Sequence, residues 1–132
     1  MSTITFSDWF DIFYSTNVSE YDMCELSDGR YLCSFCDAAD DDKIKAVVLK
    51  KIGDEIFSGA VETITTTASK YPSCCKFSNN ETKPRALIVW TDITGSDVDC
   101  KAMWVEVNTD DSITTKTETI IKEAAAGDDC AE

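Results

Sequence analysis

Large apolar residues near the start of the chain recur every three or four positions. This stripe consists of Phe6, Trp9, Phe10 and Phe13. Ser7 and Asp8 precede most of it, and both residue types are common where helices begin. The spacing predicts a helix from about residue 7 to residue 15.

Two short apolar runs, residues 21–26 and 31–36, flank the dipeptide Asp28-Gly29. Asp-Gly readily adopts the two positive φ angles of a type I′ turn, so we expect a β-hairpin with a two-residue loop. That register places Leu26 opposite Tyr31 and Cys24 opposite Cys33. The hairpin face expected to meet the core carries Cys24, Leu26, Tyr31, Cys33 and Phe35, with Cys36 on the opposite face.

Apolar residues return at helical spacing in the middle of the chain. They are Ile44, Val47, Val48, Ile52 and Ile56. Because the preceding Asp40, Asp41 and Asp42 would favour a helix N-terminus, we expect a helix over about residues 41–58. Residues 59–69 fit a helix by their apolar spacing and a strand by their threonines, so this segment stays open.

Three strands are expected in the second half of the chain. Pro72 predicts an element boundary or a sheet edge, and a strand follows over residues 73–77. The fully apolar run from Ala86 to Trp90 is typical of a central strand covered on both faces. Residues 101–107 should pair antiparallel to it, with Met103, Val105 and Val107 on one face and Ala102 and Trp104 on the other.

The last apolar positions again have helical spacing and predict a C-terminal helix. They are Ile113, Thr117, Ile120, Ile121 and Ala124. Asp110 and Asp111 precede this helix, and Gly127 would end it before an acidic tail over residues 128–132. We therefore expect one α+β domain over residues 1–127, a mainly antiparallel sheet of about five strands with helices packed on its faces.

Composition narrows the choice of partners. The 132 residues carry a formal net charge of −13, so the surface should repel nucleic acid and anionic membranes. Lys43, Lys45, Lys50 and Lys51 could form a local basic patch, but a solvated helix face is the better interpretation. There is no apolar segment of spanning length and no N-terminal export signal, so we expect a cytoplasmic protein whose seven cysteines are free thiols.

The sequence offers little catalytic chemistry. It has no histidine, no P-loop and no nucleophile elbow, so we expect a non-catalytic protein without a cofactor. Cys33-Ser34-Phe35-Cys36 has the C-x-x-C spacing of thioredoxin-like redox proteins, but the nearby aspartates would raise the thiol pKa values. A zinc site would need Cys74 and Cys75 as well, and adjacent strand residues face opposite ways, so no metal is expected.

Three fragments resemble the actin-depolymerising factor/cofilin homology family. They are residues 4–8 with the following helix that contains Phe13, residues 86–90 with Val98, Lys101 and Met103 downstream, and residues 105–110 before the last helix. The resemblance implies an α+β fold and actin binding through Ser2, Thr3, Lys101 and Met103. The family's basic actin-binding helix has no clear counterpart here, and the long segment from Asp37 to Lys70 favours a profilin- or roadblock-like relative.

The leading functional hypothesis is therefore a non-catalytic protein-binding module, with actin as the named candidate partner. One alternative is an acidic decoy or inhibitor, whose carboxylates imitate a phosphate backbone for a basic partner such as a nucleic-acid-binding protein. A second alternative is a thioredoxin-like redox protein that uses Cys33 and Cys36.

Overall fold

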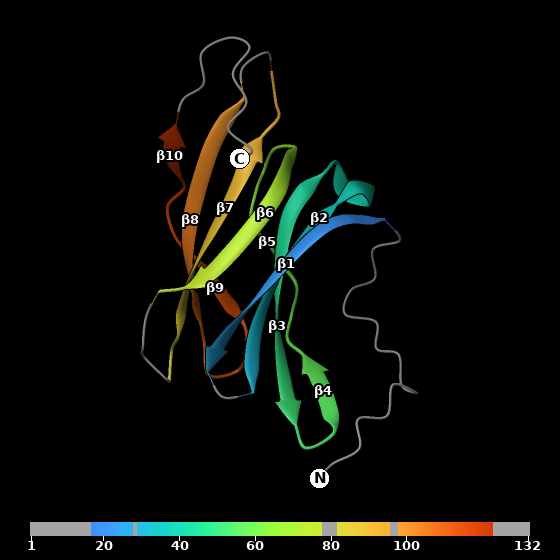
Figure 1. The fold of residues 1–132 in the computed structure, drawn as a ribbon, viewed down its shortest axis with the longest axis vertical. Helices are drawn as coiled ribbons and strands as arrows, with labels where there is room; N and C mark the ends of the chain where they lie inside the picture. Colours follow the sequence, from blue (N-terminus) through green and yellow to red (C-terminus); the bar gives the residue numbers. More distant parts are fainter. Residues whose placement is uncertain (1–16, 28, 78–81, 96–97, 123–132) are drawn as a thin grey trace.

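The computed structural model describes residues 17–27, 29–77, 82–95 and 98–122, which form two antiparallel β-sheets packed face to face (Figure 1). Sheet A has the order β1 (Val18–Ser27), β2 (Arg30–Asp37) and β3 (Lys43–Ile52), and β3 pairs with both β4 (Glu55–Ser58) and β5 (Glu62–Thr63). Sheet B has the order β6 (Ser69–Lys76), β7 (Arg85–Asp92) and β8 (Asp99–Val107), and β8 pairs with both β9 (Ile113–Thr115) and β10 (Thr119–Lys122). A 3-10 turn, η1 (Ala38–Asp40), connects β2 and β3.

The predicted α+β class is wrong, because this all-β sandwich has no α-helix among its described residues. The segment expected to be a helix over residues 41–58 forms β3, a turn at Gly53 and β4. Residues 44, 46 and 48 of β3 face one side and residues 47 and 49 face the other, and all five are buried. A strand buried on both faces has no period-two signal, so its apolar run imitates a helix.

The predicted C-terminal helix is also wrong over the described part of its range. Residues 113–115 and 119–122 form β9 and β10 along one edge of β8. Seven of the residues from Ile113 to Ile121 are threonine or isoleucine, and β-branched side chains fit a strand better than a helix. The predicted N-terminal helix over residues 7–15 and the acidic tail over residues 128–132 lie outside the described residues.

The predicted hairpin is confirmed, but its register is wrong. Ser27 pairs with Arg30 around the Asp28-Gly29 position, as expected. An irregularity between Glu25 and Ser27 then shifts the ladder by one residue, so Cys24 pairs with Leu32 and Met23 pairs with Cys33. Cys24 and Leu26 consequently face the main core, whereas Tyr31, Cys33 and Phe35 lie on the other face of sheet A.

The two later strands agree better with the sequence. Residues 86–90 lie in β7, which is paired on both sides, and β8 is antiparallel to it as predicted. Met103, Val105 and Val107 face the core from β8. The strand expected over residues 73–77 is the longer β6, and Pro72 lies at a register irregularity in this sheet-edge strand. The open segment 59–69 contains β5 and ends where β6 begins.

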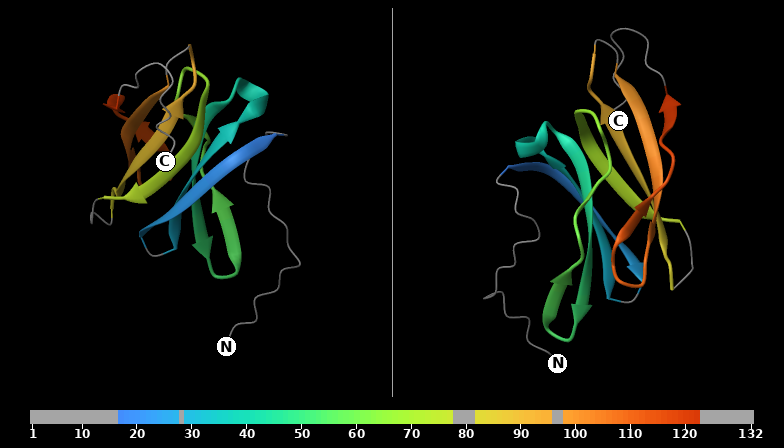
Figure 2. Two further views of the ribbon diagram at one scale, coloured as in Figure 1. Left: turned by 45° about the horizontal axis from the view of Figure 1, so that its top comes forward. Right: turned by 180° about the vertical axis from the view of Figure 1, so that it is seen from behind.

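The main core fills the space between the two sheets, whose arrangement in two layers is visible in Figure 2. Its largest fully buried side chains are Trp90, Leu26, Leu32, Ile44 and Ile88, drawn from both sheets. A smaller apolar cluster lies on the outer face of sheet A and consists of Cys33, Phe35, Val47 and Leu49, with Val18 and Tyr31 packed against it. Strands β2 and β3 are thus apolar on both faces, which explains why they gave no alternating pattern.

Strands β1 and β6 are the facing edges of the two sheets (Figure 1). Carboxylates of β1 cover the edge of β6. The backbone N–H of Tyr71 donates to Glu20 Oε2 at 2.6 Å, and that of Cys74 donates to Asp22 Oδ2 at 2.9 Å. Ser73 Oγ also donates to Asp22, at 3.2 Å. These side chains satisfy backbone donors that would otherwise be open to another strand.

A second connection joins the sheets at their other end. The Arg30 guanidinium donates two hydrogen bonds to Asp111 Oδ1, at 3.0 and 2.8 Å, and one to the Asn108 carbonyl at 2.8 Å. Gly59 lies against the same turn, and a Cβ atom there would overlap the Asp111 carbonyl oxygen. The start of β2 and the β8–β9 turn are therefore held in close contact.

Candidate functional site

A row of paired residues crosses the outer face of sheet B. Cys75 of β6 pairs with Leu87 of β7, and Leu87 pairs with Trp104 of β8. Their neighbours along the strands, including Ala86, Ile88, Met103 and Val105, point into the main core. Because side chains alternate along a strand, Cys75, Leu87 and Trp104 point away from it. Leu87 and Trp104 are half-buried, and Cys75 is exposed.

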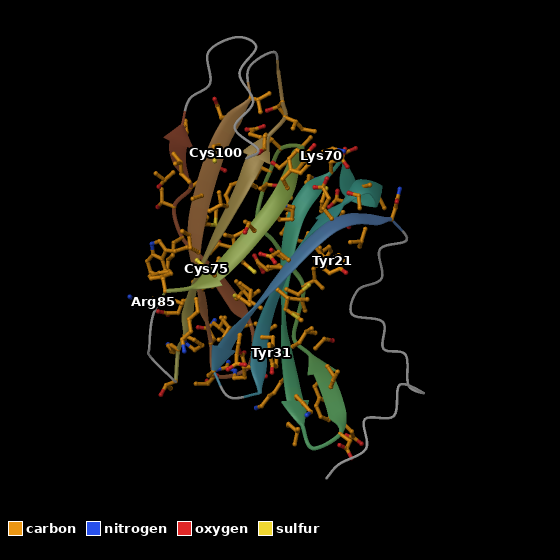
Figure 3. The ribbon with its side chains drawn as sticks, in the orientation of Figure 1. Tyr21, Tyr31, Lys70, Cys75, Arg85 and Cys100 are labelled. Carbon is orange, nitrogen blue, oxygen red and sulfur yellow. The ribbon has the colours of Figure 1, made fainter. Side chains whose placement is uncertain are left out.

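The indole of Trp104 organises the side chains around it. The Phe77 ring meets it edge to face, with ring centroids 5.9 Å apart and planes at 89°. Arg85 Cζ and Lys116 Nζ each lie 5.0 Å from the Trp104 ring centroid, within cation–π range. We call these five residues, Phe77, Arg85, Leu87, Trp104 and Lys116, the Trp104 patch. Figure 3 shows Arg85 and Cys75 at this end of sheet B.

The Trp104 patch is locally cationic on a strongly acidic chain. Arg85 Nε contacts Glu106 Oε2 at 3.2 Å, but 43% of the Arg85 side chain remains exposed. Lys116 makes no ion pair with any residue in the described part of the chain. Phe77 is 50% exposed, so apolar and cationic groups are available at the same place.

Two of the four residues predicted to bind a partner, Lys101 and Met103, lie in the described part of the chain. Ser2 and Thr3 lie outside the described residues. Met103 is 8% exposed and belongs to the main core. The Lys101 side chain is 15% exposed, and its Nζ lies 2.7 Å from Asp92 Oδ2 and 3.1 Å from Glu118 Oε1. A binding role for these residues stays a prediction, and the geometry gives Met103 and Lys101 structural contacts.

The pKa values of Asp92 and Lys101 are both shifted from their ordinary values. Burial alone would raise the pKa of Asp92, but hydrogen bonds from Lys101 and Thr94 outweigh it and hold that pKa below its ordinary value. The pKa of Lys101 is raised, chiefly by its hydrogen bond to Asp92. Both shifts favour the ionised pair, as expected for groups that are charged in the folded protein.

The cysteines of the C-x-x-C sequence lie on opposite faces of β2. Cys33 belongs to the outer cluster of sheet A and Cys36 belongs to the main core, so the two thiols do not form a dithiol pair. Burial, with smaller contributions from the charges of Cys74 and Asp22, raises the pKa of Cys33 to about 11. The Cys36 thiol donates to the Ser69 carbonyl at 3.3 Å and thereby joins β2 to β6.

The lysines that were candidates for a basic patch are on β3 and not on a helix. Lys45 Nζ lies 2.8 Å from Asp37 Oδ2 and 3.0 Å from Asp40 Oδ2, and Lys43 Nζ lies 3.0 Å from Asp40 Oδ1. The hydrogen bond that Lys45 donates to Asp37 is the main cause of the raised pKa of Lys45. Lys43 and Lys45 are therefore neutralised within the chain, in contrast to Lys116.

Searches of the described residues found neither a metal-binding group nor a membrane-spanning helix. No three His, Cys, Asp or Glu side chains in residues 17–27, 29–77, 82–95 and 98–122 gather in a way that could hold an ion. No helix in the same ranges is long and apolar enough to cross a bilayer.

Sequence reasoning placed Trp104 on the face opposite Met103 but missed the patch around it. Phe77 and Arg85 come next to Trp104 only through the pairing of β6, β7 and β8, and Lys116 reaches it from the segment after β9. The alternation of residues 101–107 was the one signal that could have indicated an exposed tryptophan. Comparisons with protein-family models, with curated proteins and with solved structures found no match to this chain.

Proposed function

We propose that this protein is a non-catalytic protein-binding module and that the Trp104 patch is its recognition surface. The observation that carries the proposal is the half-exposed Trp104, which has Phe77 at its edge and two cations at 5.0 Å from its ring centroid. Tryptophan and arginine are the residue types most enriched at energetic centres of protein interfaces. The rigid β-sandwich beneath supplies a preorganised platform.

The charge of the patch defines the chemistry of the partner. Lys116 and the exposed part of Arg85 favour carboxylates, and the exposed parts of the Phe77 and Trp104 rings favour an apolar side chain packed against them. We therefore propose that the partner is a peptide segment in which an apolar residue is flanked by Asp or Glu. Such a segment gains local attraction even though the chain as a whole is acidic.

A displayed library of random peptides, selected on wild-type protein, tests this proposal. We expect enrichment of peptides with an acidic residue next to a large apolar one, and at least about tenfold weaker binding by the Trp104→Ala variant. Tyr21→Ala is the matched control, because Tyr21 is an aromatic residue that is 76% exposed on the other sheet. Basic enriched peptides, or binding that survives Trp104→Ala, would contradict the proposal.

Self-association needs a separate measurement, because a second copy of this chain could also occupy the patch. Sedimentation velocity of the wild type and of Trp104→Ala at equal concentrations distinguishes the two occupants. A wild-type dimer that Trp104→Ala converts to a monomer would assign the surface to a second copy and would overturn the acidic-peptide partner. A monomer in both cases is the expected result.

Actin is the one partner that the family resemblance suggested. Its support is the family resemblance alone, and the α+β fold that this resemblance implied is not the observed one. Co-sedimentation with filamentous actin and a monomer-binding assay are the direct tests, again with Trp104→Ala beside the wild type. Binding that depends on Lys101 but not on Trp104 would favour the residues predicted from the resemblance.

The acidic-decoy alternative has less support from the described side chains. Many carboxylates already serve the fold: Glu20, Asp22, Asp37, Asp92 and Asp111 all accept hydrogen bonds within the chain. We also infer a cytoplasmic location, supported by the free thiols of Cys24, Cys33, Cys36, Cys74 and Cys75. Alkylation of freshly lysed cells, followed by mass measurement, tests that inference, and a native disulfide in the unstressed protein would contradict it.

A further inference from the structure

Two cysteines from different sheets meet where β1 lies beside β6. Cys24 of β1 packs against the main core, and Cys74 of β6 is buried within it. Cys24 lies on the edge strand β1 and is half-buried, so part of the residue is exposed. Neither the C-x-x-C sequence nor the Trp104 patch involves this pair.

Backbone and side-chain contacts fix the position of Cys74 relative to Cys24. The Cys74 N–H donates to Asp22 Oδ2 at 2.9 Å, and the Cys74 thiol donates to the Leu32 carbonyl at 3.7 Å. Leu32 is the direct cross-strand partner of Cys24, and Asp22 lies two residues before Cys24 on the same face of β1. The Cys74 sulfur therefore lies over the β1–β2 ladder beside Cys24.

The other described cysteines are placed elsewhere. Cys33 lies in the cluster on the far face of sheet A, and Cys36 bonds to Ser69. Cys75 points to the outer face of sheet B, and Cys100 is on β8. Within the part of the chain that the structure describes, Cys24 and Cys74 are the thiols that meet on the core side of the β1–β6 contact.

The two thiols also differ in acidity. Their mutual hydrogen bond is the largest cause of both shifts, and it lowers the pKa of Cys74 and raises the pKa of Cys24. This direction favours Cys74 as the attacking thiol, because the thiolate is the reactive form in thiol–disulfide exchange.

We propose that Cys24 and Cys74 are an oxidation site, at which a low-molecular-weight disulfide such as oxidised glutathione converts the pair to an inter-sheet disulfide. The Cys74 thiolate attacks one sulfur of oxidised glutathione, and the other glutathione leaves as its thiolate. Cys24 then loses its proton and attacks the Cys74 sulfur, which releases the second glutathione. The pair loses two protons and two electrons, and one oxidised glutathione becomes two reduced ones.

The bond would link the facing edges of the two sheets and constrain the unfolded chain between residues 24 and 74. Closing a loop of this length typically raises stability, and we expect the melting temperature to rise by roughly 10 °C on oxidation and to return on reduction with dithiothreitol. The site is independent of the proposed partner-binding function. A negative result for the oxidation site would not affect the proposed partner binding, and the reverse also holds.

The test incubates purified wild-type protein with oxidised glutathione, blocks residual thiols with N-ethylmaleimide and maps peptides without reduction. We expect one linked peptide pair that contains Cys24 and Cys74, together with the rise in melting temperature. Cys24→Ser and Cys74→Ser should each abolish the linked pair and the rise. Cys75→Ser is the matched control, because it removes the neighbouring thiol from the opposite face and should leave both intact.

Two further measurements distinguish the loss of the disulfide from the loss of the fold. Cys24→Ala is measured beside Cys24→Ser, and circular dichroism of each reduced variant checks that the sheets form. A stable mixed disulfide with glutathione at Cys74, a linked pair that involves another cysteine, or no linked peptide at all would overturn the proposal.

Discussion

The two sheets share one plan but differ in what their outer faces carry. Each consists of three long strands in chain order, with a fourth position divided between two short strands: β4 and β5 beside β3, and β9 and β10 beside β8. The outer face of sheet A holds a buried apolar cluster around Phe35. The outer face of sheet B holds the half-exposed Trp104 patch. The same architecture therefore buries an apolar cluster on one outer face and leaves an aromatic patch partly open on the other, where we propose that recognition takes place.

Removing one aromatic ring from each outer face should show the difference between the two faces most clearly. Phe35→Ala empties a fully buried site, so we expect a loss of about 4 kcal/mol in the free energy of unfolding. Trp104→Ala removes a ring that is only partly covered and should cost about 1 kcal/mol. Urea unfolding followed by circular dichroism measures both. Equal losses would contradict the division of roles between the outer faces.

Thiols on the two outer faces provide a second comparison. Cys33 is buried with its pKa raised to about 11, whereas Cys75 is exposed. At pH 7.5 we expect iodoacetamide to label Cys75 at least about a hundredfold faster than Cys33, which corresponds to roughly 2.7 kcal/mol. Mass spectrometry of timed digests gives both rates. Fast labelling of Cys33 in the native protein would show that the outer cluster of sheet A is open.

Replacing an arginine by lysine should also cost more stability at the buried Arg30 than at the exposed Arg85, although the difference is smaller. Arg30 makes three hydrogen bonds across the sandwich and its side chain is 12% exposed, so Arg30→Lys should cost about 1.5 kcal/mol by losing the planar fork of donors. Arg85→Lys is the matched control on the exposed Trp104 patch and should cost less than about 0.5 kcal/mol. Urea unfolding of both variants makes the comparison, and a larger loss for Arg85→Lys would contradict it.

The smallest predicted effect concerns the Asp92–Lys101 pair and pH. The folded pKa of Asp92 is below its unfolded value, so its stabilisation is present above about pH 4 and is lost as the pH falls through the folded pKa. The raised pKa of Lys101 means that its contribution is complete below about pH 10 and is lost as the pH rises through the folded value. Asp92→Asn should therefore narrow the difference in unfolding free energy between pH 7 and pH 3 by about 1 kcal/mol. An unchanged pH profile would contradict this assignment.

Sequence reasoning succeeded where a local signal was sufficient. Asp28-Gly29 indicated the hairpin, and the run from Ala86 to Trp90 indicated an interior strand. It failed for β3, because Ile44 to Leu49 are buried on both faces and imitate helical spacing. The register of the hairpin failed by one residue because nothing in the sequence signals the irregularity near Leu26.

The candidate site was harder to predict than the strands. Trp104 could be assigned to the face opposite Met103 from alternation alone. Its contacts with Phe77, Arg85 and Lys116 depend on three strand pairings and one connection, and single-residue patterns carry no information about those pairings. The same limitation hid the meeting of Cys24 with Cys74, which are 50 positions apart in the chain.

The division of the chain into two consecutive sheets has a consequence for synthesis. Sheet A is complete by residue 63, and sheet B begins at residue 69. The main ladders of each sheet join strands that are neighbours in sequence, so they are local contacts that form early. During translation, sheet A can pair before β7 and β8 leave the ribosome, but its inner apolar face has no cover until they arrive. Slowing the ribosome after residue 63 should therefore lengthen the time for which this face is accessible to chaperones.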